Sequence, residues 1–261
     1  MTPRDRISEA IRGARNGTAI VAFVTAGFPL RERFREHLVQ VGNEADVVEI
    51  GVPFTDPMAD GMTIQRSSVE ALRQGVTLRW VLSELEQMQA SRTLPRAPLL
   101  LMSYLNPLLA FGFAELAAAA ARAGVCGFIV PDLPYDESAE FRAALEPHGL
   151  AMIQMVTPVT RPERLAQLCA AAQGFVYAVT MTGVTGRTAA VPAEVQSYLD
   201  AVRADAKLPV CAGFGIRSRA QVEQLQGHVA GVIVGSALVE VMENGQDAAQ
   251  FLRSLRPAGA T

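Results

Sequence analysis

The sequence predicts an α/β protein built as a single (β/α)8 barrel, the TIM-barrel architecture, with an extra N-terminal helix. Three observations point to this fold: eight short apolar runs, helical segments between them, and a core-rich chain of 261 residues of which 50% are hydrophobic. Near-continuous apolar strands that alternate with helices are typical of a parallel sheet buried on both faces. A doubly wound open sheet usually has about five to seven strands, so the closed barrel fits better.

The predicted strands are all short runs rich in apolar and β-branched residues, and they are Ala19–Thr25, Val47–Gly51, Leu99–Met102, Cys126–Val130, Ala151–Val156, Phe175–Thr180, Val210–Gly213 and Gly231–Gly235. Apolar residues at spacings of three and four predict helices between them, including residues 78–88, 111–123, 138–146, 162–172, 192–204 and 219–226. Another helix, over residues 3–15, is expected to close the lower end of the barrel. Because no linker-like stretch divides the chain, residues 1–261 are predicted to form one domain.

Composition excludes several classes of function. The formal net charge of −3 does not favour a nucleic-acid partner. No apolar run approaches the roughly 20 residues that a membrane span needs, and residues 1–17 lack the apolar core of a signal peptide. Cys126, Cys169 and Cys211 are too far apart for a metal knuckle. We therefore expect a reduced, cytoplasmic protein without a membrane anchor.

Chemistry in such barrels lies at the C-terminal ends of the strands and in the loops that follow. Glu49 is embedded in the apolar strand of residues 47–51. Burial of a carboxylate costs several kcal/mol unless the group is paired or protonated. A structural hydrogen bond to a neighbouring loop and a catalytic role both remain open for this residue.

The loop after this strand carries two more carboxylates, Asp56 and Asp60. Asp60 could cap the helix that is expected to begin near Thr63, because Asp is a favoured N-cap residue. Three acidic residues within a short segment could also bind a metal ion. No histidine lies nearby, however, so no metal site is predicted.

Glycines follow three consecutive strands, at Gly183–Gly186, Gly213–Gly215 and Gly235–Ser236. Glycine lets the backbone approach a ligand closely, and the amides of a helix N-terminus attract an anion. Tight turns would explain any one of these segments. Their position in the last loops of the barrel favours a phosphate site.

The segment from Val48 to Gly61 resembles the signature of the tryptophan synthase alpha subunit family. Shorter motifs support the resemblance, which covers residues 5–256 in order: Thr25-Ala26-Gly27, Pro131-Asp132-Leu133-Pro134, Gly183-Val184-Thr185-Gly186 and Gly213-Phe214-Gly215-Ile216. The chain departs from better-known members at Phe28, Met62 and Met181. None of these three positions belongs to the carboxylate pair.

The resemblance implies a lyase that cleaves indole-3-glycerol phosphate to indole and D-glyceraldehyde 3-phosphate by a retro-aldol reaction. Glu49 and Asp60 match the two catalytic carboxylates of the family. Glu49 would protonate carbon 3 of indole and help remove a proton from the side-chain hydroxyl. Asp60 would accept the indole N–H and stabilise positive charge on the ring.

The resemblance also implies the binding residues. Matches around the indole ring, each of which could equally be barrel packing, are Phe23, Leu101, Tyr104, Ile129 and Tyr177. Matches around the phosphate are Gly186, Gly215, Gly235 and Ser236, with Thr185 in a lid loop.

The family pairs this subunit with a PLP-dependent beta subunit in an α2β2 assembly, and indole passes to that partner. No cofactor is expected in this subunit. Positions that match the contact surface are Pro53, Phe54, Asp56, Pro57, Asn106 and Leu108. Exposed Leu108, Leu109 and Phe111 would suit an interface, or they could belong to the buried face of a helix.

Three rival functions were weighed. A barrel synthase that makes indole-3-glycerol phosphate would need a catalytic lysine on a strand, whereas the one lysine, Lys207, lies in a predicted loop. A non-catalytic regulatory subunit that binds a phosphorylated ligand is disfavoured because both Glu49 and Asp60 are present. A stand-alone indole-3-glycerol phosphate lyase shares the same chemistry and differs only in its coupling to a partner.

Overall fold

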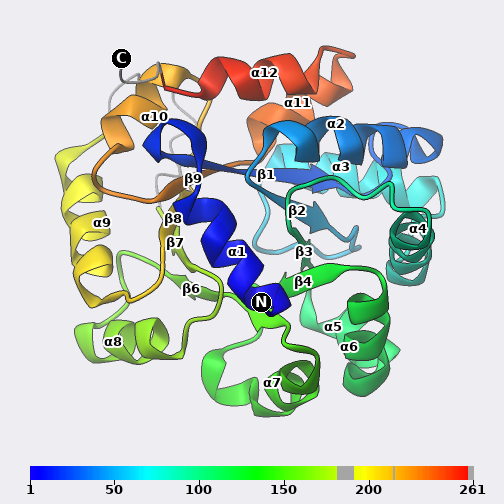
Figure 1. Cartoon of the computed structure of the whole chain (residues 1–261), viewed down its shortest axis with the longest axis horizontal. Helices are drawn as coiled ribbons and strands as arrows, with labels where there is room; N and C mark the ends of the chain where they lie inside the picture. The colour runs from blue at the N-terminus through cyan, green and yellow to red at the C-terminus, as the bar shows by residue number, and fades with distance from the viewer. Residues whose placement is uncertain (181–190, 214, 258–261) are drawn as a thin grey trace.

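A ring of parallel strands forms the centre of the molecule, and helices surround it, in the computed structural model (Figure 1). The structure describes residues 1–180, 191–213 and 215–257. Within these residues nine strands form one parallel sheet in the order β5-β4-β3-β2-β1-β9-β8-β7-β6. Their bounds are β1 Ala19–Thr25, β2 Val47–Gly51, β3 Leu99–Met102, β4 Val125–Ile129, β5 Ala151–Met152, β6 Gln154–Val156, β7 Val176–Val179, β8 Val210–Gly213 and β9 Gly231–Val234.

The two end strands of this order, β5 and β6, are separated in the chain by one residue, Ile153. β5 pairs with β4 and β6 pairs with β7. The Ile153 N–H donates to the Phe128 carbonyl oxygen at 2.9 Å, which continues the ladder across the interruption. β5 and β6 are thus two halves of one interrupted strand, and the sheet closes on itself. This confirms the predicted (β/α)8 barrel with its eight strand segments, and the structure adds the interruption at Ile153.

The helices lie outside the ring, apart from α1, and their bounds are α1 Pro3–Arg12, α2 Phe34–Glu44, α3 Met62–Arg73, α4 Leu78–Ala90, α5 Leu105–Phe111, α6 Phe113–Arg122, α7 Ala139–Leu145, α8 Pro162–Ala171, α9 Ala193–Asp205, α10 Arg219–Leu225, α11 Ser236–Glu243 and α12 Ala248–Leu255. The predicted helix over 111–123 starts two residues later, because Gly112 has φ +90° and separates α5 from α6. None of the described helices is long and apolar enough to cross a membrane.

Two layers of core follow from the alternation of side chains along each strand. On β1, Ile20, Ala22 and Val24 pack outward against the surrounding helices in the larger cluster. Ala19 and Val21 point inward, where they meet apolar residues of the other strands in a second cluster. A strand buried on both faces needs apolar residues at nearly every position. This requirement explains the unbroken apolar runs in the sequence.

The expected N-terminal helix closes one end of the barrel. α1 crosses the ring of strands in Figure 1, and its Ile7 and Ile11 are buried in the inner cluster. Ser8 Oγ donates to the Gly174 carbonyl oxygen at 2.5 Å, and the Arg4 N–H donates to the Gly149 carbonyl oxygen at 3.1 Å. These contacts lie where β5 and β7 begin, so α1 covers the N-terminal ends of the strands. The loops that follow the strands lie at the opposite end of the barrel.

Candidate active site

The C-terminal ends of β1 and β2 place an aromatic ring and a carboxylate side by side. Phe23 and Glu49 are direct neighbours in the parallel register. Both side chains point into the barrel, because the next residue on each strand, Val24 after Phe23 and Ile50 after Glu49, lies in the outer core. A carboxylate on this face has no access to the solvent that surrounds the helices. The barrel interior is therefore its only environment.

Glu49 is almost completely buried, with 1% of its surface exposed. Neither of its carboxylate oxygens has a hydrogen-bond partner among the described residues. Burial raises the pKa of Glu49 from 4.5 to about 8, because desolvation penalises the charged form. The group is consequently a protonated acid at neutral pH, and its proton has no acceptor within the described chain.

Asp60 has a different environment, in the loop between β2 and α3. Its Oδ2 accepts a hydrogen bond from the Tyr104 hydroxyl at 3.0 Å. Burial raises the pKa of Asp60, and the hydrogen bond from Tyr104 opposes that rise. The carboxylate does not cap α3, whose N-cap is Gly61 without a side-chain bond. The capping role that the sequence left open is thus absent.

Tyr104 holds the loop that carries Asp60. Its hydroxyl also accepts the Ala59 N–H at 2.9 Å, and its ring stacks on Phe54 with centroids 5.2 Å apart. With 3% of its surface exposed, Tyr104 needs partners for its polar end. The tyrosine satisfies this requirement and fixes two consecutive loop residues by the same contacts.

One cavity of about 180 Å³ joins the two carboxylates. Its lining comes from the C-terminal ends of β1, β2, β3, β7, β8 and β9 and from neighbouring segments, and consists of Phe23, Glu49, Asp60, Ile64, Met102, Tyr177, Val179, Gly213, Gly215, Ile233, Gly235 and Ser236. Burial raises the pKa of the Tyr177 hydroxyl, and the nearby charges of Glu49 and Asp60 add to the effect. Tyr177 therefore lies within electrostatic reach of both carboxylates.

Two glycines give the cavity its aromatic walls. A Cβ on Gly51 would lie 2.4 Å from Cζ of Phe23, and a Cβ on Gly213 would lie 3.0 Å from Cε1 of Tyr177. No larger residue fits at Gly51 unless Phe23 moves. The absence of a side chain at Gly51 on β2 and at Gly213 on β8 thus leaves room for the rings of Phe23 and Tyr177 on the neighbouring strands.

Part of the cavity lining carries backbone groups suited to an anion. Gly235 is the N-cap of α11 and Ser236 is its first residue. The first amides of a helix have no intrahelical acceptor and carry partial positive charge. Gly215, with φ +69° and no atom within 4 Å of a Cβ added to it, also lines the cavity. These amides suit a phosphate group, and the remaining apolar and aromatic lining suits an apolar group.

Comparisons with known proteins agree with this geometry. The family model described as tryptophan synthase alpha chain matches residues 10–258. The chain is 43% identical over 252 residues to the tryptophan synthase alpha chain of Solidesulfovibrio magneticus, covering 96% of each protein. The chain belongs to the tryptophan synthase alpha chain family.

Other relatives and solved structures support the assignment. The alpha chain of Geobacter sulfurreducens is 43% identical, with 92% of each protein covered. The structure of the Legionella pneumophila alpha subunit is 32% identical with a TM-score of 0.86, covering 98% of this chain and 97% of that chain. A Mycobacterium tuberculosis tryptophan synthase structure is 33% identical with a TM-score of 0.85, covering 98% and 99%.

Membership of the tryptophan synthase alpha chain family confirms the predicted activity. The chain is a lyase for the indole-3-glycerol phosphate half-reaction of tryptophan synthesis. The family also implies a beta-subunit partner. The rival readings as a barrel synthase or a non-catalytic regulatory subunit are thereby wrong.

The structure brings most of the residues predicted for the tryptophan synthase site together. Residues from both the catalytic and the binding sets line the cavity, namely Phe23, Glu49, Asp60, Tyr177, Gly215, Gly235 and Ser236. Tyr104 reaches the cavity through its hydrogen bond to Asp60. Ile129 belongs to the inner barrel cluster and is fully buried, so it supports the site without lining it. Thr185, Gly186 and Met181 lie outside the described residues.

The prediction that Leu101 contacts indole is wrong. Leu101 lies in the outer core against the helices, and its neighbours Leu100 and Met102 point into the barrel. The register of β3 and β4 shifts between Leu99 and Leu100, which the sequence does not reveal. Met102 takes the place in the cavity that was predicted for Leu101.

The predicted partner surface divides into exposed and buried residues. Asp56 and Asn106 are exposed, and Phe54 and Pro57 are half-buried. Leu108 is fully buried in the outer core and Pro53 is also buried, so their prediction as contact residues is wrong. The alternative reading of Leu108 as part of the buried face of a helix is correct, whereas Leu109 is 53% exposed.

Several cavity residues were not predicted from the sequence, namely Ile64, Met102, Val179, Gly213 and Ile233. Gly213 was noted only as part of a glycine pair. The apolar members carry no distinguishing signal, because every strand end is apolar. Ile64 could have been found from its position in the first turn of α3, directly after the Asp60 loop.

Phe28, one of the departures from better-known members, packs beside the site. It is buried in a small cluster with Phe23, Ile64 and Val239. Met62, the second departure, is 78% exposed on the first turn of α3. Neither residue lines the cavity. Phe28 therefore supports the wall from behind.

Proposed function

We propose that Glu49 is the general acid–base of the indole-3-glycerol phosphate lyase reaction and that Asp60 binds the indole N–H. The observation that carries the proposal is the contrast between two carboxylates on one cavity. Glu49 is buried without a hydrogen-bond donor among the described residues, whereas Asp60 accepts a hydrogen bond from Tyr104. This difference between the two environments favours Glu49 as the proton donor and Asp60 as the group that accepts the indole N–H.

The cleavage requires one proton donated and one removed. Protonation of indole carbon 3 by Glu49 converts the ring to a cation that can accept electrons. The carboxylate that remains takes the proton of the side-chain hydroxyl, and the carbon–oxygen bond becomes the aldehyde as the bond to carbon 3 breaks. The electron pair of that bond restores the indole ring, and Glu49 is again protonated. General acid–base assistance of this kind typically contributes about 10²–10⁴-fold.

Asp60 is suited to the ring because the charge on the indole develops during protonation. An ionised carboxylate that accepts the indole N–H stabilises that charge more in the transition state than in the ground state. The Tyr104 hydroxyl favours the ionised form by donating to Oδ2. It also leaves Oδ1 available to the substrate. Tyr104 is therefore a positioning residue.

The phosphate of the substrate is proposed to bind at the N-terminus of α11 and beside Gly215. Gly235 and Ser236 line the cavity at the start of α11. The reaction needs only a proton donor, an acceptor and an anion site. These groups are supplied by this chain, so we propose that the subunit uses no metal ion or cofactor of its own.

We further propose that the loop after β2 and helix α5 meet the beta subunit, as in an α2β2 assembly that passes indole to a PLP site in the partner. Met58, Met62 and Leu109 are large apolar residues with 76%, 78% and 53% of their surfaces exposed. All three follow β2 or β3 at the open end of the barrel. Free, buried cysteines fit a reduced cytoplasmic setting.

The test measures indole release from indole-3-glycerol phosphate by the purified chain, alone and with beta subunit added. Wild-type chain should release indole and form a larger complex that works faster. Asp60→Asn keeps the size of the side chain but loses its charge, and should lower kcat/KM by roughly 10²-fold. An unchanged kcat/KM would refute the role of Asp60. Full activity without any complex would favour the stand-alone lyase.

A further inference from the structure

A second cavity, of about 400 Å³, lies at the opposite end of the barrel from the active site. Its lining comes from α1, the end of α4, the segment between α4 and β3, the first residue of β3 and the residue before β4, and consists of Arg6, Gln89, Arg92, Leu94, Pro95, Ala97, Leu99 and Gly124. Leu99 begins β3 and Gly124 directly precedes β4. The cavity is thus at the N-terminal ends of the strands and shares no residue with the carboxylate site.

The polar side chains of this cavity have no partners within the protein. Arg6 and Arg92 form no ion pair or hydrogen bond through their guanidinium groups, and the Gln89 carboxamide forms none, in the part of the chain that the structure describes. The lining contains no Asp or Glu. Other arginines of the chain are paired, such as Arg4 with Glu146 and Arg122 with Glu86.

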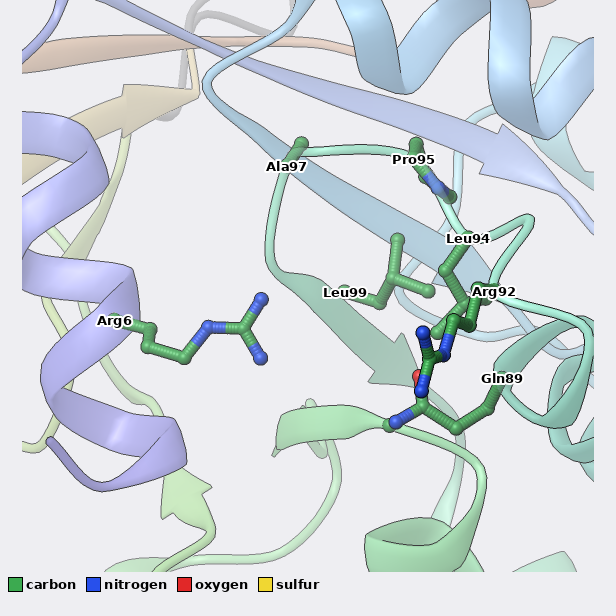
Figure 2. A pocket seen from close by; sticks show the side chains of 8 residues that line it. Arg6, Gln89, Arg92, Leu94, Pro95, Ala97 and Leu99 are labelled. Atoms are coloured by element: carbon green, nitrogen blue, oxygen red, sulfur yellow. The ribbon is translucent and has the colours of Figure 1, made fainter.

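The two arginines lie on opposite sides of the cavity. In Figure 2 the Arg6 side chain extends from α1 towards the cavity, while Arg92 and Gln89 lie across from it at the end of α4. Leu94, Pro95 and Leu99 line the space beside them. Two guanidinium groups on separate elements can each present a planar pair of N–H donors to the same anion.

The backbone around Arg92 is shaped for this placement. Arg92 has φ +58°, a conformation that residues other than glycine, asparagine and aspartate rarely adopt. The bonds from Arg92 N–H to the Gln89 carbonyl (3.1 Å) and from Thr93 N–H to the Met88 carbonyl (2.9 Å) hold the turn. A Cβ on Gly124 would lie 2.8 Å from Leu94 and 3.0 Å from Oε1 of Gln89. The glycine thereby leaves room for both side chains on the wall.

We propose that this cavity binds a phosphate monoester with an apolar body, held between Arg6 and Arg92. Two unpaired positive charges match a dianion, and Gln89 can donate a further hydrogen bond. The volume falls within the range of about 300–1,000 Å³ for small-molecule sites, and the mixture of apolar walls with a few polar groups is typical of them. The site is independent of the lyase reaction, because it lies at the other end of the barrel.

The test titrates the full chain with phenyl phosphate by calorimetry and follows the arginine Nε–H signals by NMR. Since the active site also accepts phosphate, wild-type chain should show two binding events. The double variant Arg6→Gln/Arg92→Gln should lose one event, with at least about a tenfold loss of affinity for each arginine. Indole release should remain unchanged.

A double variant Arg12→Gln/Arg73→Gln is the matched control, because it removes the same charge from arginines outside the cavity. It should keep both events. The proposal is overturned if Arg6→Gln/Arg92→Gln retains both events, or if phenyl phosphate leaves the Arg6 and Arg92 signals unmoved in wild-type chain. Benzoate, a monoanion of similar shape, should bind at least tenfold more weakly. Equal affinity would refute the dianion class. If wild-type chain shows both binding events but releases no indole, the proposed lyase mechanism fails and the proposal for this cavity stands.

Discussion

Replacement of Glu49 by glutamine should make the protein more stable at neutral pH while it removes catalysis. The physical reason is the cost of a buried ionisable group. In the folded chain the pKa of Glu49 is raised from 4.5 to about 8 by desolvation. Between these two values the unfolded chain releases the proton and the folded chain keeps it. Stability is therefore greatest below the unfolded value and falls as the pH rises towards 8.

The magnitude follows from the size of this window. Each pH unit inside it costs 1.36 kcal/mol of stability, so wild-type chain should lose about 3 kcal/mol relative to Glu49→Gln between pH 5 and pH 7. Above pH 8 both states are ionised and the difference levels off. Glutamine has nearly the same shape and does not titrate. The loss is consequently absent from the variant.

The assay is urea unfolding of wild type and Glu49→Gln at pH 5 and pH 7, with indole release measured on the same samples. An exposed glutamate, replaced in Glu32→Gln, is the control, because water solvates its charge in both states. The gap between Glu49→Gln and wild type should widen with pH, whereas the control gap should not. If the Glu49→Gln gap is the same at both pH values, Glu49 is ionised when buried and the proposed proton donor does not exist.

Two further predictions concern the same site. The kcat/KM for indole release should fall as the pH rises through about 8, because the free enzyme then loses the proton on Glu49; a profile that stays flat to pH 9 would contradict that role. Tyr104→Phe removes the bonds to Asp60 and Ala59, and should lower kcat about tenfold and stability by about 1–3 kcal/mol. In this variant the pH dependence of kcat/KM should keep its midpoint, and a large shift would mean that Tyr104 acts on Glu49 instead.

The strands were predictable because each is a short apolar run between polar segments. β1, β2, β3 and β8 have the predicted bounds. The interruption at Ile153 was not predictable, because an apolar residue between two half-strands gives no signal. The side of the sheet to which Leu101 points could not be predicted for a similar reason. Leu99 to Met102 are all apolar, so the two-residue alternation that would separate inward from outward positions is missing.

In the helices, the sequence left a different property undetermined, namely which apolar residue is buried. Leu108 and Leu109 are adjacent apolar residues on α5, and only the packing against the core decides which one is buried. The sequence alone is therefore compatible with either leucine being buried. The Tyr104 case is intermediate: its polar end clearly needed a partner if buried, but Asp60 lies 44 positions earlier in the chain. The pairing of β2 with β3 places the segments after these strands side by side and brings the two residues together.

The two carboxylates differ because Glu49 lies on a strand and Asp60 lies on a loop. Glu49 is fixed by the ladder of β2, so its isolation and raised pKa are properties of the barrel itself. Asp60 has no such support, and among the described contacts its carboxylate is held by one tyrosine. A change that loosens the β2 loop should consequently affect the binding of the indole N–H and leave the proton donor intact. A partner docked on this loop could thus control catalysis without touching Glu49.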